Sequence, residues 1–189
     1  MSTIQNVIVC VYDTMCNLPI DLVTKLWDSV NSHLTLPYDF LCLTNDPDLL
    51  YNVGVPTLPL RQNWGWPWSL MEVLDRGTYD KDCGVLYFDL DVVITGELDS
   101  VLRFGQEYKL CLVKKRGKRV INRYGTEMLW VRPELLRYAV TMFKEDSSFF
   151  RGHYGRPSQF LGLVYPDVRT WPIKWTVPGD LSRITIKGV

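Results

Sequence analysis

The sequence predicts an α/β fold, a single-domain α/β/α sandwich built around a mainly parallel central sheet. Short apolar runs of strand length alternate along the chain with segments whose apolar residues recur at helical spacing. This alternation is typical of parallel strands joined by helical crossovers, which cover both faces of the sheet. The chain has 189 residues, no internal repeat and no linker-like segment, so one domain over residues 1–189 is expected.

The first part of the chain contains two predicted strands with a helix between them. Residues 7–11 read Val-Ile-Val-Cys-Val and are expected to form a buried strand. An amphipathic helix follows, with Pro19 near its first turn. Residues 38–43 form the second predicted strand, and Pro56 and Pro59 then suit an extended loop or a sheet edge.

The middle of the chain is expected to hold a short helix, two strands and a helical turn between them. Ser69-Leu-Met-Glu72 fits a capping box, with Gly77 placed to end that helix. The uncharged run 84–88 is typical of a buried strand. A helical turn around residues 98–102 and a strand over 108–113 follow.

The last third begins with the basic run 114–119, which is expected to be a solvated loop, with attraction of an anionic acceptor as the alternative. Residues 125–131 are expected to form a strand, and Pro133 starts an amphipathic helix. After about residue 147 the pattern weakens into Gly, Pro and aromatic residues.

Composition excludes several classes of protein. Apolar residues make up 47% of the chain, aromatic residues 13%, and the formal net charge is zero, which excludes a disordered chain and gives no sign of nucleic-acid binding. The first apolar run has no basic region before it and is too short for a signal peptide or a membrane span. The five cysteines show no paired metal-ligand spacing, so reduced thiols and a cytoplasmic location are expected.

Polar clusters follow three of the predicted strands, at 12–14 (Tyr-Asp-Thr), 44–46 (Thr-Asn-Asp) and 89–91 (Asp-Leu-Asp). In open α/β sheets, ligands bind at the carboxyl ends of the strands. The three clusters are therefore expected to converge on one site.

Asp89 and Asp91 are the strongest candidates for metal ligands. In an extended backbone, residues two apart point to the same face, so both carboxylates could reach one point. Hard divalent cations such as Mn²⁺ or Mg²⁺ relieve the repulsion between such oxygens. The chain has neither a G-x-G-x-x-G after its first strand nor a Gly-Lys-Ser/Thr phosphate loop, so a metal could instead neutralise a diphosphate leaving group.

The chain has two histidines, which leaves little material for Ser-His-Asp catalysis. His33 lies at a predicted helix end and is expected to cap it. His153 lies in the polar and aromatic stretch 151–155, where either a functional or a structural role is open.

With these pieces in place, the chain resembles a small nucleotide-sugar-dependent glycosyltransferase of the A-type fold, the class marked by an Asp-x-Asp motif. The resemblance covers about residues 4–165. The matching pieces are the strand at 7–11, the helix end at 33–34, the segment 37–46, the Trp-rich segment before Ser69, the segment 86–99 and, more weakly, 122–130 and 158–159.

The resemblance implies a Rossmann-like fold, with a nucleotide-binding part at about 1–100 and an acceptor part at about 101–189. Asp91 would bind Mn²⁺ directly, and Asp89 would contact the metal or the ribose. Asn122 and Thr126 would lie near the sugar or the acceptor. The residues expected to bind the nucleotide-sugar are Tyr12, Asp13, Thr44, Asn45, Asp89, Leu90 and Asp91.

The implied reaction moves a sugar from a nucleotide diphosphate-sugar, with UDP favoured, to an acceptor hydroxyl of a glycan. The catalytic candidates are Asn122, Ser158 and Gln159. Related enzymes have a basic residue where this chain has Leu70, and an acidic residue where it has Ser158, so a phosphate contact and a general base stay open. The chain also lacks a late metal-binding histidine, a place that water, nucleotide oxygens or His153 could take.

Two other interpretations remain. Phe88-Asp-Leu-Asp-Val92 also resembles the first motif of haloacid-dehalogenase-like phosphatases, although that motif normally opens the fold and here two strand units precede it. The other is a nucleotide-sugar-binding protein without catalysis. On the acceptor side, His153 and Tyr154 are the main candidates among the aromatic residues after 147, since rings bind the apolar faces of sugars. The remaining members of that group are Phe149, Phe150, Trp171 and Trp175.

Overall fold

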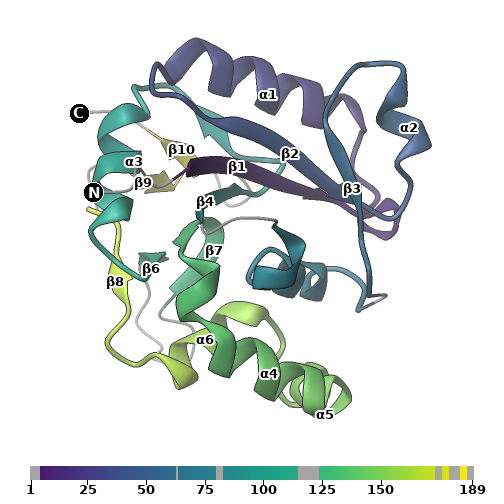
Figure 1. Cartoon of the computed structure of the whole chain (residues 1–189), viewed down its shortest axis with the longest axis vertical. Coiled ribbons are helices and arrows are strands. Elements are labelled where there is room, and N and C mark those ends of the chain that lie inside the picture. Colours follow the sequence, from purple (N-terminus) through teal and green to yellow (C-terminus); the bar gives the residue numbers. More distant parts are fainter. Residues whose placement is uncertain are drawn as a thin grey trace.

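The computed structural model describes residues 5–62, 64–79, 83–114, 124–172, 176–178 and 184–186. Within these residues, seven strands form the main sheet in the order β3-β2-β1-β4-β7-β6-β8, and three form a second sheet in the order β5-β10-β9 (Figure 1). The strands are β1 (Gln5–Tyr12), β2 (Asp39–Thr44), β3 (Thr57–Pro59), β4 (Cys83–Phe88), β5 (Val93–Ile94), β6 (Leu110–Lys114), β7 (Tyr124–Val131), β8 (Arg169–Thr170), β9 (Thr176–Pro178) and β10 (Ile184–Ile186).

The main sheet is mainly parallel, as the sequence predicted. The pairs β1–β2, β2–β3, β1–β4 and β6–β8 are parallel, and only β7 runs against its neighbours β4 and β6 among the described pairs. The predicted strand at 125–131 is thus confirmed, and it runs antiparallel to both of its neighbours. β3, which follows Pro56 and ends at Pro59, lies at the edge of the sheet. Proline has no backbone N–H, and at an edge its absence removes no hydrogen bond between central strands.

Helices and 3-10 turns cover both faces of the sheet, which confirms the predicted sandwich. On one face, α1 and α3 pack against Ile8 and Cys10 of β1; on the other, η2, α4 and α6 pack against Val7, Val9 and Val11 (Figure 1). Successive residues of β1 therefore enter two separate cores, as a doubly covered strand requires. The helical elements are η1 (Thr14–Cys16), α1 (Asp21–His33), α2 (Asp48–Tyr51), η2 (Trp68–Glu72), η3 (Arg76–Thr78), α3 (Asp99–Gln106), η4 (Pro133–Leu135), α4 (Arg137–Glu145), α5 (Ser147–His153) and α6 (Pro157–Val164).

The capping box expected at residues 69–72 is wrong. Ser69 lies inside the 3-10 helix η2, and its hydroxyl donates to Asp13 instead of accepting a backbone N–H at a helix start. Glu72 accepts backbone N–H groups from Arg61 and Gln62 at 2.7 and 2.8 Å. Gly77 belongs to the separate turn η3. Ser69 and Glu72 therefore bond to residues outside their own helix, which the spacing of the two residues does not reveal.

Two helices after residue 147 were not predicted. In α5, Asp146 caps the first turn by accepting the N–H of Phe149 at 3.0 Å. α6 starts at Pro157 and buries Phe160 and Leu161 against the sheet. Both helices are short, with seven residues in α5 and eight in α6, so they present no clear amphipathic period. The basic run predicted as a loop lies outside the described residues except for Lys114, which ends β6.

His33 lies at a helix end, as the sequence predicted. His33 is the last residue of α1, and its ring Nδ1 lies 2.8 Å from the carbonyl oxygen of Ser29. All five cysteines lie in the described ranges, and no disulfide joins any of them. No helix in the described ranges is both long enough and apolar enough to cross a membrane.

Candidate functional site

The carboxyl ends of β2, β1 and β4 lie side by side at one edge of the sheet. Tyr12, the last residue of β1, pairs with Thr44, the last residue of β2. On the other side of β1, Val9 pairs with Tyr87, one residue before β4 ends at Phe88. The fold therefore brings the three polar clusters to the same edge, as the sequence predicted.

Asp13 joins three segments at this edge. Its side chain is 2% exposed, and Oδ1 accepts hydrogen bonds from the backbone N–H of Met15 at 3.0 Å and from Asn45 Nδ2 at 3.1 Å. Oδ2 accepts the hydroxyl of Ser69, itself 1% exposed, at 2.9 Å. Hydrogen bonds to a buried carboxylate are charge-assisted and strong. Asp13 thus holds η1, the end of β2 and η2 together.

The neighbouring polar side chains complete this network. Asn45 accepts the backbone N–H of Thr14 through Oδ1 and donates to the Thr14 hydroxyl through Nδ2, both at 3.0 Å. The buried Thr44 hydroxyl accepts the N–H of Asp46 at 3.1 Å. Tyr12 is 8% exposed, and burial raises the pKa of its hydroxyl. These side chains give the edge a fixed shape.

The backbone at the acid pair is a turn, so the expectation that Asp89 and Asp91 share one face of an extended strand is wrong. β4 ends at Phe88, and the N–H of Val92 donates to the carbonyl oxygen of Asp89 at 3.1 Å. Leu90, at the middle of the turn, is 4% exposed and packs in the core. Both carboxylates are half-buried at the sheet edge. The alternation rule does not apply here because the strand ends at Phe88, before the acid pair.

Tyr87 and β7 hold Asp89 in place. The Tyr87 hydroxyl donates to Asp89 Oδ1, and the Asp89 N–H donates to the carbonyl oxygen of Glu127 at 2.8 Å. Burial, together with the charge of Asp89 and the hydrogen bond to it, raises the pKa of Tyr87 well above its usual value. The Tyr87 hydroxyl therefore stays protonated at neutral pH and keeps its donor role.

Sequence reasoning missed Tyr87, Ser69 and Glu127 at this site. Glu127 continues the antiparallel ladder one residue beyond the Phe88–Met128 pair, which brings a third acidic residue beside Asp89. The sequence did hold one signal for Glu127, because it is an acidic residue inside the otherwise largely apolar predicted strand 125–131. Within the described ranges, no group of three or more His, Cys, Asp or Glu side chains is arranged to hold a metal ion.

The other predicted site residues lie on α5, α6 and β7. Ser158 is 4% exposed near the start of α6, and Gln159 accepts the N–H of Gly155 at 3.0 Å. Thr126 is half-buried in the first half of β7, the half beside the end of β4. Leu70, at the position where related enzymes carry a basic residue, is a core residue at 3% exposure.

The aromatic candidates for the acceptor side divide into exposed and buried rings. His153 is exposed and stacks on Phe149, with ring centroids 5.3 Å apart. Tyr154 is half-buried and stacks on Phe150. Trp171 is 1% exposed and its indole donates to the carbonyl oxygen of Met128 at 3.2 Å, so this ring packs in the core. Asn122 and Trp175 lie outside the described residues.

Comparison by sequence finds no matching family model and no matching curated protein. Solved structures do resemble the chain. The glycosyltransferase GlyE of Streptococcus pneumoniae TIGR4 matches with a TM-score of 0.66 at 13% identity, over 92% of this chain and 46% of that one. The galactosyltransferase LgtC, in complex with donor and acceptor sugar analogs, matches with a TM-score of 0.59 at 15% identity, over 89% of this chain and 74% of that one.

A third match is CMP:2-keto-3-deoxy-manno-octonic acid synthetase complexed with CTP, with a TM-score of 0.58 at 12% identity, over 88% of this chain and 89% of that one. This chain spans about half the length of GlyE. At such identities the likeness establishes architecture, and function has to be argued from the site. The chain has the Rossmann-like fold of the A-type glycosyltransferases, as the sequence predicted.

Proposed function

We propose that the protein is a metal-dependent glycosyltransferase that moves a sugar from a nucleotide diphosphate-sugar, with UDP favoured, to an acceptor hydroxyl of a glycan. The observation that carries this proposal is the position of Asp89-Leu90-Asp91. In a fold shared with glycosyltransferases, these residues follow the central strand β4 at the carboxyl edge, beside the polar ends of β1 and β2. Ligands of open α/β sheets bind at this edge.

The residues present fit a hard divalent cation. Asp89 and Asp91 offer anionic oxygens from a half-buried turn, and such oxygens are the ligands that Mn²⁺ and Mg²⁺ prefer. Asp89 and Asp91 would hold the ion, with nucleotide oxygens and water completing its coordination. Bound there, the ion would supply charge stabilisation for a departing diphosphate.

The chain's own residues bind and orient the donor in this proposal. Tyr87 fixes one oxygen of Asp89, which sets the direction of the other. The Asp13–Asn45–Ser69 network holds the loops that flank the nucleotide, and Tyr12 and Thr44 lie at the strand ends beneath it. Preorganised polar groups of this kind cost no reorganisation when the reaction occurs.

In the transfer step, the acceptor oxygen bonds to the anomeric carbon as the bond between that carbon and the diphosphate oxygen breaks, and the proton of the acceptor hydroxyl passes to the departing diphosphate or to water. Gln159 and Thr126 are proposed to contact the sugar or acceptor, and exposed His153 to contact the acceptor. The catalytic roles of Asn122 and Ser158 and the contact of Tyr154 with the acceptor stay predictions. The division of the chain into a nucleotide-binding part and an acceptor part and the cytoplasmic location also stay predictions.

A turnover assay tests the reaction. The protein is incubated with Mn²⁺ and a panel of UDP-sugars, with and without glycan acceptors, and UDP and inorganic pyrophosphate are measured separately. The proposal predicts metal-dependent UDP release that accelerates with a suitable acceptor. Pyrophosphate release from a nucleoside triphosphate and a sugar would instead indicate sugar-nucleotide synthesis, the activity of one protein that shares the fold. Cleavage of phosphate monoesters would favour the phosphatase interpretation, and donor binding without turnover the binding-only one.

A further inference from the structure

The first turn of α6 holds two hydrogen-bond donors on one nearly buried residue. Ser158, the second residue of α6, is 4% exposed, and within the described ranges its hydroxyl makes no hydrogen bond. Its backbone N–H precedes the first helical hydrogen bond, so no carbonyl group of the helix accepts it. Because each Cα–Cβ bond of a helix tilts toward the helix start, the hydroxyl and the N–H lie toward the same end. Ser158 therefore offers two donors to a ligand at the start of α6.

The start of α6 has no side-chain cap on its first turn. Arg156, the N-cap residue, makes no side-chain hydrogen bond to the helix. The N–H of Gln159 donates to the carbonyl oxygen of Arg156 at 3.1 Å, and the Gln159 side chain accepts the N–H of Gly155 at 3.0 Å. These two bonds fix the loop that enters the helix. The positive end of the helix dipole is thus held in a fixed place, where an anion is stabilised.

The charge next to this turn is positive. Arg156 is exposed directly before the helix, and residues 147–166, all of them described, contain no Asp or Glu. Arg151 lies in the last turn of α5, where it meets the negative end of that helix dipole. Arg156 has no comparable role in a helix. A guanidinium beside two donors suits a carboxylate or phosphate, whose oxygens each accept charge-assisted hydrogen bonds.

Ring contacts connect this turn to the candidate site. Trp68 stands next to Ser69 of that site, and its ring stacks on Phe143 of α4 with centroids 5.2 Å apart. The Phe143 ring also contacts that of Phe160, two residues after Ser158, with centroids 5.9 Å apart. Figure 1 shows α4, α5 and α6 on the same side of the main sheet as η2. The first turn of α6 therefore lies beside the part of η2 that borders the carboxyl edge.

We propose that the first turn of α6, together with Arg156, binds a carboxylate or phosphate group of the acceptor, so that the acceptor glycan is anionic. The assignment to an acceptor rests on the proposed function, which places the donor diphosphate at Asp89 and Asp91. The anion at α6 is then a second one, held by Ser158 and the helix start. A neutral hydroxyl at this place would leave the charge of Arg156 and the helix dipole without a partner.

The test is nuclear magnetic resonance on ¹⁵N-labelled protein titrated with glucuronate, glucose 6-phosphate, glucose and inorganic phosphate. At least one of the two anionic sugars should shift the amide signals of Ser158 and Gln159. It should bind at least about tenfold more tightly than glucose, the effect expected from one charge-assisted hydrogen bond. Saturating UDP with Mn²⁺ should leave these shifts in place. Ser158→Ala and Arg156→Gln should each weaken the binding by a similar factor.

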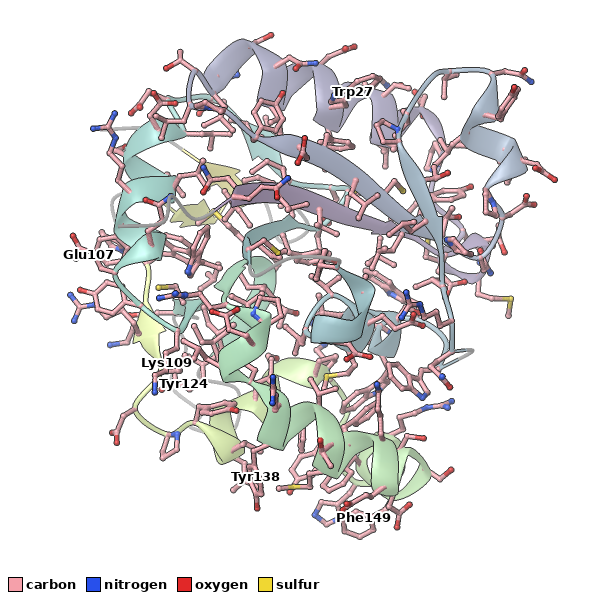
Figure 2. All side chains as sticks on the ribbon, in the orientation of Figure 1. Trp27, Glu107, Lys109, Tyr124, Tyr138 and Phe149 are labelled. Carbon is pink, nitrogen blue, oxygen red and sulfur yellow. The ribbon has the colours of Figure 1, made fainter. Side chains whose placement is uncertain are left out.

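Ser158→Ala also gives a readout in the free protein. Since the Ser158 hydroxyl makes no hydrogen bond within the described ranges, its removal should change the melting temperature by less than about 2 °C. Lys109→Gln is the control for loss of a positive charge and should bind the anionic sugar as the unaltered protein does. Lys109 is exposed, and Figure 2 shows it well apart from Phe149 of α5.

The proposal is overturned if neither anionic sugar binds the folded protein, or if glucose or inorganic phosphate binds as tightly as both. Unchanged affinity in folded Ser158→Ala or Arg156→Gln would overturn it too, as would displacement of the anionic sugar by UDP. A clear loss of stability in Ser158→Ala would show that the hydroxyl serves the fold, and would equally overturn it. Binding of an anionic sugar at α6 by a protein that binds no UDP-sugar would remove the proposed function and leave the anion site standing.

Discussion

Ser69→Ala tests the buried network that holds the candidate site together. The Ser69 hydroxyl is the donor to Asp13 Oδ2 at 2.9 Å, and both residues are 2% exposed or less. Alanine removes the donor and leaves a buried carboxylate oxygen short of a hydrogen bond. Hydrogen bonds to charged groups contribute about 1.5–3 kcal/mol, so we expect the free energy of unfolding to fall by about 2 kcal/mol. For a chain of this length, that is a melting-temperature decrease of about 4–8 °C.

Ser32→Ala is the matched control. The Ser32 hydroxyl lies on the exposed face of α1 and donates to the carbonyl oxygen of Asp28 at 2.8 Å within the same helix. Its loss should change the free energy of unfolding by less than about 0.5 kcal/mol. Urea denaturation followed by tryptophan fluorescence measures both variants. A Ser69→Ala protein no less stable than Ser32→Ala would refute the view that Asp13 anchors η2 to the strand ends.

Three further predictions concern packing and ionisation. Gly84→Ala would place a Cβ 2.1 Å from Trp130 Cη2 in the core, so it should destabilise the protein by at least about 1–3 kcal/mol in the same denaturation assay, and an effect below about 0.5 kcal/mol would contradict the packing. Burial raises the pKa of Tyr79 and Tyr87 well above 10.0. Their contribution to stability is therefore complete below the unfolded-state pKa near 10 and declines as the pH rises past it. A free energy of unfolding that increases between pH 10 and 11 would contradict this prediction. Cys16 is the half-buried cysteine while the other four are buried, so a thiol reagent should modify it first under native conditions, as mass spectrometry of digested protein would show.

The sequence predicted features that depend on local pattern. The strand runs at 7–11 and 84–88 are apolar on both faces, and both lie in the centre of a sheet covered on two sides. Because these strands are parallel, the polar residues after them had to meet at one edge.

Features that depend on distant partners could not be predicted. The chain turns at 89–92, where the N–H of Val92 bonds to the carbonyl oxygen of Asp89 and the N–H of Asp89 to that of Glu127, a partner on β7 that the Asp-x-Asp spacing does not show. Ser69 and Glu72 bond to segments far away in sequence, although their spacing matches a capping box. α5 is held by ring contacts such as Phe143–Phe150, which carry no helical period.

The central claim is that the acid pair binds a metal together with a nucleotide-sugar. Titration calorimetry of UDP-glucose, UDP-galactose and UDP-N-acetylglucosamine, with Mn²⁺ and with EDTA, tests it most directly. Asp91→Asn replaces an anionic ligand by an amide, and Asp167→Asn makes the same change at an exposed carboxylate before β8. We predict donor binding that requires Mn²⁺, is lost in Asp91→Asn and persists in Asp167→Asn. Equal affinity in Mn²⁺ and EDTA, or unchanged Mn²⁺-dependent binding by Asp91→Asn, would contradict the account.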